Sequence, residues 1–134
     1  MPSLPLPIPN EDTQPFWDYT KVGELRAQRC TSCGTLRHPP RPSCAECGSF
    51  GVEWVPLSGR GVIYSYEVSR QAIHPALEGL IPHTAILVRL EEGPLITSNL
   101  VEGDERVAIG LAVEVVFEPV NDTITLPKFR LVAG

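Results

Sequence analysis

All four cysteines of this chain lie within residues 30–48, in two copies of the pattern Cys-x-x-Cys-Gly. The copies begin at Cys30 and Cys44, and their second cysteines are Cys33 and Cys47. The ten residues between Cys33 and Cys44 allow a hairpin that brings four thiolates around one tetrahedral ion. Each copy ends in glycine, which permits the tight turn that such a site needs. The spacing therefore predicts a metal site, with two disulfides or four unrelated thiols as the alternatives.

The predicted ion is zinc, and its predicted role is structural. Four sulfur ligands complete a tetrahedral zinc site, whereas a catalytic zinc keeps one position for water or substrate. Iron fits the same ligands and is the less favoured alternative. His38 lies between the two copies, but because the ion already has four ligands we expect this histidine to face solvent. We expect one zinc ion to stabilise this segment, since so small a unit has little core of its own.

The chain divides into three predicted parts. The first is an extended segment with a short helix (residues 1–23), the second is the cysteine-containing ribbon (24–50), and the third is a β domain (51–134). The β domain carries about five runs rich in β-branched and aromatic residues, separated by turn sequences. One turn, EEGP, predicts a hairpin between residues 86–90 and 95–100. The predicted fold class is thus mainly β, with a five-stranded barrel of the OB type.

A short helix is predicted over residues 13–22. Candidate N-cap residues precede Pro15, and Gly23 follows as a stop signal. Phe16 and Trp17 share one face of this helix. That face either packs on the rest of the protein or anchors a partner, because aromatic residues are enriched at interfaces.

The charge of the chain argues against nucleic acid as its ligand. The net charge is −5 at pH 7, and the basic residues exceed the acidic ones only in residues 21–50. Proteins that bind phosphate backbones usually carry a basic stripe, although ribbons and OB barrels often bind nucleic acids. Nucleic-acid binding is therefore kept as the alternative function. The basic cluster of Arg29, Arg37 and Arg41 is explained most simply as compensation of an anionic metal site.

No set of residues suggests catalysis by this chain alone. His38, His74 and His83 are the candidate bases, and none has a nucleophile motif beside it. His74 and His83 flank the longest irregular connection of the predicted barrel, where a solvated loop histidine is the simpler interpretation. The sequence has neither an apolar run of roughly 20 residues nor a basic leader, so we expect a cytoplasmic protein without a membrane span.

The order of several motifs resembles one known family. These motifs are the aromatic helix QPFWDY, a ribbon in which PPRPSC ends at the third cysteine, the segment VEWVPLSGRGVIYSY and the tail LPKFRLV. The chain resembles the rubredoxin-like zinc ribbon plus OB-fold proteins, a domain-of-unknown-function family associated with acyl-CoA metabolism. The resemblance covers the chain from Asn10 onward.

The resemblance implies an accessory subunit without activity of its own. Members are similar to subunits or domains that accompany thiolase-like enzymes, including thiolase-type acyltransferases and the lipid-transfer-protein aldolases of steroid degradation. In those assemblies the thiolase-like chain carries the catalytic residues, and the ribbon–OB chain helps to form the site of a CoA thioester. For this chain we therefore expect a hetero-oligomer, with a partner or ligand surface that includes Phe16, Trp17, Arg37, Arg41 and Phe129.

Overall fold

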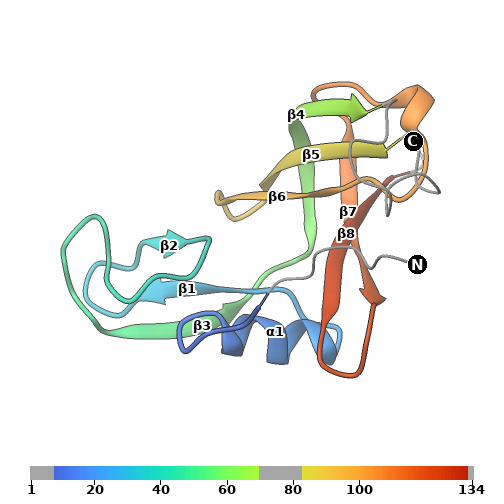
Figure 1. Ribbon diagram of the computed structural model, residues 1–134. Coiled ribbons are helices and arrows are strands. Elements are labelled where there is room, and N and C mark those ends of the chain that lie inside the picture. Colours follow the sequence, from blue (N-terminus) through green and yellow to red (C-terminus); the bar gives the residue numbers. More distant parts are fainter. Residues whose placement is uncertain (1–7, 70–82, 133–134) are drawn as a thin grey trace.

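The computed structural model describes residues 8–69 and 83–132 (Figure 1). Within these residues the strands form two antiparallel sheets, one of three strands and one of five. This mainly β arrangement with a short helix confirms the predicted fold class. The elements in chain order are α1 (Gln14–Lys21), β1 (Arg26–Cys30), β2 (Leu36–Arg37), β3 (Val52–Pro56), β4 (Arg60–Ser69), β5 (His83–Leu90), β6 (Leu95–Asn99), the 3-10 turn η2 (Asp104–Arg106), β7 (Ala112–Pro119) and β8 (Thr125–Leu131).

Helix α1 begins at Gln14 because the turn before it is held by side chains. Asn10 Oδ1 accepts hydrogen bonds from two backbone N–H groups of the next turn, at 2.9 and 3.0 Å. Thr13 Oγ1 in return accepts one from the N–H of Asn10 at 2.9 Å. The helix ends before Gly23, whose φ of 80° lies in the left-handed region that favours glycine. These bounds agree with the helix predicted over residues 13–22.

The three-stranded sheet carries the cysteine segment. Its order is β2-β1-β3, and β1 pairs with β3 from Arg26↔Pro56 to Cys30↔Val52. A further hydrogen bond, from the N–H of Leu57 to the carbonyl of Leu25 (2.8 Å), continues the pairing toward the barrel. The sheet thus includes residues 52–56, which follow the segment predicted as the ribbon.

The five-stranded sheet, of order β6-β5-β4-β7-β8, forms the OB-fold barrel. A register shift between Ile63 and Ser65 lets the long strand β4 bend and pair with both β5 and β7. β5 and β6 pair as a hairpin, which confirms the hairpin predicted around EEGP. The end strands β6 and β8 meet beside an isolated bridge between Leu100 and Phe129, and the N–H of Val101 donates to the carbonyl of Phe129 (2.9 Å).

The core fills the inside of the barrel and continues beneath α1. Phe16 of the helix and Leu25 after it belong to the same buried cluster as the strand residues, so the barrel and the helix share one core. The buried members are Phe16, Leu25, Ile63, Ile86, Val88, Leu90, Ile96, Leu100, Val113 and Phe129. No helix in the described part of the chain is long and apolar enough to cross a membrane.

Candidate metal centre and adjoining groove

The first cysteine pair forms a tight knuckle at the end of β1. The N–H of Cys30 donates to the carbonyl of Thr35 (2.9 Å), and the N–H of Gly34 donates back to the carbonyl of Cys30 (2.9 Å). Gly34 has a φ of 78°, a conformation that a residue with a Cβ rarely adopts. The backbone therefore turns around the position between the two sulfurs.

The second pair repeats this geometry in the loop before β3. The N–H of Cys44 donates to the carbonyl of Ser49 (2.9 Å), and the N–H of Gly48 donates to the carbonyl of Cys44 (2.8 Å). Gly48 has a φ of 77°. A hydrogen bond from the hydroxyl of Ser32 to that of Ser49 (3.0 Å) connects the two knuckles. The matching turns give each knuckle one buried and one exposed cysteine.

The four thiols, which are not joined as disulfides, lie at the spacing of a tetrahedral metal site. All four sulfur atoms lie within 4.8 Å of one another, with Cys30–Cys47 at 3.5 Å and Cys33–Cys44 at 3.6 Å. Zinc–sulfur bonds of about 2.3 Å give tetrahedron edges of about 3.8 Å. Hydrogen bonding from the backbone N–H of Cys33 lowers the pKa of the Cys30 thiol to about 6, which favours the thiolate that a metal requires. The donor set fits zinc, as the sequence predicted.

The three arginines of the ribbon have different surroundings. Arg29 forms an ion pair with Glu53 across β1 and β3. Arg37 donates from Nε to Gln28 Oε1 (2.6 Å) and from Nη2 to the carbonyl of Arg41 (3.0 Å), while its buried Nη1 has no hydrogen-bond partner within the described residues. Arg41 is exposed, and its side chain forms no ion pair among the residues that the structure describes. Arg37 thus holds the hairpin loop against β1, and Arg41 points to solvent.

The aromatic residues of α1 are buried to different degrees. Phe16 is 5% exposed and packs edge-on against Trp17, with ring centroids 4.9 Å apart. Trp17 is half-buried, so part of its ring is accessible. Phe129, expected at the partner surface, has no exposed area and packs in the barrel core, because the alternation of β8 turns its side chain inward. A partner therefore cannot contact Phe129 in this conformation.

His38 is half-buried, whereas the sequence predicted a solvent-facing side chain. Its ring lies 5.3 Å from that of Phe16, at an angle of 46°, where the hairpin loop crosses the start of α1. This burial lowers the pKa of the imidazole to about 4, so the side chain is neutral at pH 7. Of the two other histidines, His83 is the first residue of β5, and His74 lies outside the described residues.

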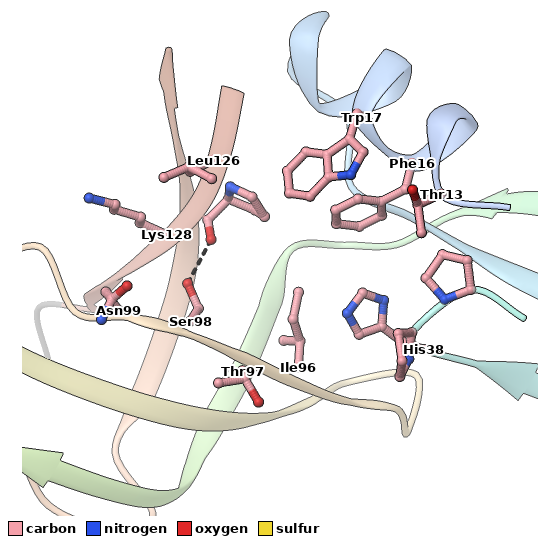
Figure 2. A pocket seen from close by; sticks show the side chains of 13 residues that line it. Thr13, Phe16, Trp17, His38, Ile96, Thr97, Ser98, Asn99, Leu126 and Lys128 are labelled. Carbon is pink, nitrogen blue, oxygen red and sulfur yellow. Dashed lines mark hydrogen bonds between the residues drawn. The ribbon is translucent and has the colours of Figure 1, made fainter. Parts of the chain in front are cut away.

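A groove of about 290 Å³ lies where α1, the hairpin loop and the end strands of the barrel meet. Figure 2 shows Phe16 and Trp17 above it, His38 at one side, and β6 and β8 forming the opposite wall. The floor is crossed by a hydrogen bond from the Ser98 hydroxyl to the carbonyl of Pro127 (2.6 Å). Sequence reasoning identified Phe16 and Trp17 but missed the strand residues, because β6 and β8 come together only when the barrel closes.

A second exposed apolar surface, the β4 patch, lies on the outside of the barrel. We define it as Val62, Tyr64, Ile109, Leu111 and Val132. Backbone hydrogen bonds join the Ile109–Leu111 loop to Ile63, and Val132 to Ala112, so these residues lie on neighbouring segments of the chain. Ile109 is 70% exposed and Tyr64 47% exposed. Apart from the alternation of residues along β4, no pattern in the sequence indicates this patch.

Two family sequence profiles match adjacent parts of the chain. Residues 17–53 match "ChsH2, rubredoxin-like zinc ribbon domain", and residues 54–118 match "ChsH2, C-terminal OB-fold domain". The junction between the two matches falls within β3, which pairs with β1 of the ribbon and leads into the barrel.

Curated relatives carry two kinds of name. A probable enoyl-CoA hydratase alpha subunit of Thermomonospora curvata is 39% identical over 94% of this chain, and a 3-oxo-4,17-pregnadiene-20-carboxyl-CoA hydratase alpha subunit of Mycobacterium tuberculosis is 39% identical over 83%. The chain spans only 39% and 35% of these relatives' lengths. A DUF35 domain-containing scaffold protein of Methanothermobacter thermautotrophicus is 35% identical, over 73% of this chain and 74% of the relative.

Solved structures show the same fold. One chain of a structure described as an Ltp2-ChsH2(DUF35) aldolase superposes with a TM-score of 0.85 and 38% identity, covering 94% of this chain and 98% of the other. A DUF35 protein of unknown function from Sulfolobus solfataricus shares the fold at a TM-score of 0.62 and 16% identity, over 91% and 86% of the two chains. The chain therefore belongs to the ChsH2/DUF35 family, in which a rubredoxin-like zinc ribbon precedes an OB-fold domain.

Proposed function

We propose that this chain is an accessory subunit of an acyl-CoA enzyme complex, and that it binds a thiolase-like partner and helps to form that partner's CoA-thioester site. The observation that carries the proposal is the match, over nearly the whole length of both chains, to a chain of the Ltp2-ChsH2(DUF35) aldolase. The relatives named as alpha subunits of CoA-thioester hydratases add support from sequence. Both hydratase names specify a CoA thioester.

The proposal gives the metal a structural role. Cys30, Cys33, Cys44 and Cys47 would hold one zinc ion, and four thiolates leave no position for water or substrate. The ion would supply stability alone, by joining the two knuckles through its four sulfur ligands. Chemistry at a CoA thioester would then be the work of the partner.

The side chains of the groove also favour a supporting role. The hydroxyl of Ser98 donates to a backbone carbonyl, so it is engaged in holding β6 to β8. His38 packs against an aromatic ring with a pKa of about 4, far below the value that suits a general base at neutral pH. These two groups therefore do not form a nucleophile and base pair.

The β4 patch is the surface that we assign to the partner. Exposed apolar side chains gathered on neighbouring segments of a small domain often mark an interaction site. Arg89, whose guanidinium lies 4.8 Å from the centre of the Tyr64 ring, adds a charged rim beside it. Aromatic and arginine side chains of this kind are common anchors of protein interfaces.

Affinity purification of the tagged chain from its native host tests the proposal. We expect a thiolase-like chain to co-purify, and an Ile109→Glu variant to lose it because the variant places a charge in the β4 patch. Val22→Glu is the matched control, since Val22 is 69% exposed, much like Ile109 at 70%, but lies beyond the end of α1. Recovery of the chain alone under gentle conditions would contradict the proposal, and equal recovery of partner with both variants would contradict the choice of surface.

A further inference from the structure

The outer face of the five-stranded sheet carries a row of apolar side chains that includes one arginine. In the strand register, Arg89 of β5 lies opposite Val62 of β4 and Leu95 of β6. Val62 in turn lies opposite Ala112 of β7. All four side chains are exposed, whereas the residue that follows each of them along its strand is buried, so the four share the outer face. Arg89 is therefore a cation placed among apolar residues.

A groove of about 440 Å³ lies at this row, and Arg89, Val62 and Ala112 belong to its lining. Val132, whose N–H donates to the carbonyl of Ala112 (3.0 Å), adds a further apolar side chain. The volume is comparable with that of sites for small molecules, roughly 300–1,000 Å³. An apolar side chain of a partner can therefore enter the groove.

The arginines next to this row have acidic partners, but Arg89 does not. Arg60 and Glu91, which both line the groove, form an ion pair at 3.6 Å. Glu114, opposite Arg60 in the register, forms one with Arg130 at 2.7 Å. Arg89 forms no ion pair with a carboxylate of the described segments. Its positive charge is thus the uncompensated one of this group.

The Tyr64 ring holds the guanidinium of Arg89 in place. The Cζ atom of Arg89 lies over this ring, 4.8 Å from its centre. A guanidinium that stacks on a ring uses its flat face, and its N–H groups stay in its own plane, free to donate. Because the side chain is already ordered, it loses less conformational entropy when it binds a carboxylate through two hydrogen bonds.

We propose that Arg89 binds a carboxylate of the partner subunit, and that an apolar side chain next to this carboxylate enters the groove. The inference rests on the function proposed above and adds the chemistry of the contact. Tyr64 is the residue that positions Arg89. A protein carboxylate fits this face better than a phosphate backbone, because the ion pairs around Arg89 are neutral and a phosphate backbone needs a basic stripe.

The thiolase-like chain that co-purifies from the native host, separated from the complex, is the probe in binding measurements at low and high salt. We expect Arg89→Met to raise its Kd at least about tenfold at low salt and to flatten the salt dependence, because methionine keeps an apolar contact without the charge. Arg29→Met is the control. It changes the net charge equally, but at an exposed residue of the three-stranded sheet that is paired with Glu53, and should leave the Kd unchanged.

The outcomes separate this inference from the function on which it rests. A wild type that binds the thiolase-like chain no better than Arg89→Met does would overturn the inference alone. A wild type that binds no such chain would contradict both the inference and the proposed function.

Two variants of Tyr64 test its role in positioning Arg89. Tyr64→Phe keeps a ring beneath the guanidinium, whereas Tyr64→Leu keeps an apolar side chain without a ring. We expect the phenylalanine variant to bind like the wild type, and the leucine variant to show the weaker, less salt-dependent binding of Arg89→Met. In an Arg89→Met background the leucine change should add little, because the two residues act as a unit. Equal Kd values for the two variants would show that Tyr64 acts only as an apolar residue, and would overturn its assignment.

A cross-linking experiment identifies the bound carboxylate. Arg89→Lys places an amine at this position, and a water-soluble carbodiimide joins an amine to a carboxylate in contact with it as an amide, taking up the water that is released. We expect peptide mapping of the complex to find position 89 joined to an aspartate or glutamate of the partner. The complex of Arg29→Lys, the matched control, should show no link from position 29 to the partner. A link from position 89 to a second copy of this chain, or no link to the partner in an intact complex, would overturn the proposal.

Discussion

The imidazole of His38 packs against the ring of Phe16 with a centroid distance of 5.3 Å, and this contact joins the ribbon hairpin to helix α1. Phe16 in turn belongs to the core that fills the barrel. The metal-binding segment is therefore coupled to the barrel through two ring side chains, in addition to the continuous backbone of β3. This coupling has a consequence for stability, because one of the two rings can ionise.

Stability should fall as the pH is lowered from about 6.5 toward about 4, because burial lowers the pKa of His38 to about 4 in the folded chain, against 6.5 when unfolded. Between these values the unfolded chain binds a proton that the folded chain does not. At pH 5.5 the loss from this group is about 1.4 kcal/mol relative to pH 8.

The measurement is urea unfolding of the wild type and of His38→Phe at both pH values. The variant keeps an aromatic ring against Phe16 but cannot ionise, so the other titrating groups cancel in the comparison. We expect the difference between the two proteins in unfolding free energy to change by about 1.4 kcal/mol between pH 8 and pH 5.5. A difference that does not vary with pH would show that His38 titrates alike in both states.

The burial of His38 illustrates what the sequence could not reveal. A histidine in the segment TLRHPPRPS has the neighbours of a solvated loop residue, and its cover comes from a helix more than 20 residues away in sequence. The metal ligands, by contrast, were predictable because their spacing is local and the chemistry of sulfur restricts the possible structures. Local signals also sufficed for α1 and for the β5–β6 hairpin.

Phe129 is a second residue whose burial depends on contacts that are distant in sequence. The tail LPKFRLV is one of the motifs of the family resemblance, which predicts its phenylalanine at a partner surface. Within β8, however, Phe129 and Thr125 are the buried positions, and Arg130 is exposed. Whether a residue in such a strand faces the core depends on how the barrel closes, and that closure involves Leu100 from a distant part of the sequence.

Replacement of Cys30 by serine should abolish zinc binding while leaving the barrel folded. The change removes one of four thiolates and introduces a poor zinc ligand, whereas the barrel core contains none of the cysteines. Metal analysis should find about one equivalent of zinc in the wild type and little in the variant. Ser32→Ala, within the same knuckle but without a ligand atom, is the control and should retain its zinc. A Cys30→Ser protein with a full equivalent of zinc would rule out the four-thiolate site. Iron in the wild type would show that the bound metal is iron and not zinc.

Replacement of Arg37 by alanine should destabilise the ribbon far more than replacement of Arg41. Arg37 donates to Gln28, which is only 3% exposed, and to the carbonyl of Arg41. Its loss leaves a buried acceptor with one partner fewer, at a cost of about 1–3 kcal/mol. Arg41 serves this network through its backbone: its N–H donates to Gln28 at 2.8 Å.

Competition with a chelator gives a measurement on the ribbon itself. Because metal binding and ribbon folding are coupled, Arg37→Ala should release zinc to the chelator more readily, and Arg41→Ala should behave like the wild type. Equal zinc retention by the two variants would mean that the hydrogen bonds of Arg37 contribute nothing to the fold. Loss of partner binding by Arg41→Ala, with zinc retained, would instead support the predicted interface role of that residue.

Replacement of Gly61 by alanine should weaken the barrel. Gly61 pairs with Leu90 on one side and Val113 on the other, and a Cβ at this position would lie 2.4 Å from the carbonyl oxygen of Arg89. Backbone cannot yield as a flexible side chain does, so β4 and β5 must separate locally, which typically costs about 1–3 kcal/mol. Glu67→Ala is the matched control, since it also introduces alanine into β4 but at an exposed position, where effects usually stay within about 0.5 kcal/mol. Urea unfolding followed by circular dichroism compares the two variants, and equal midpoints would show that the sheet tolerates the added methyl group at Gly61.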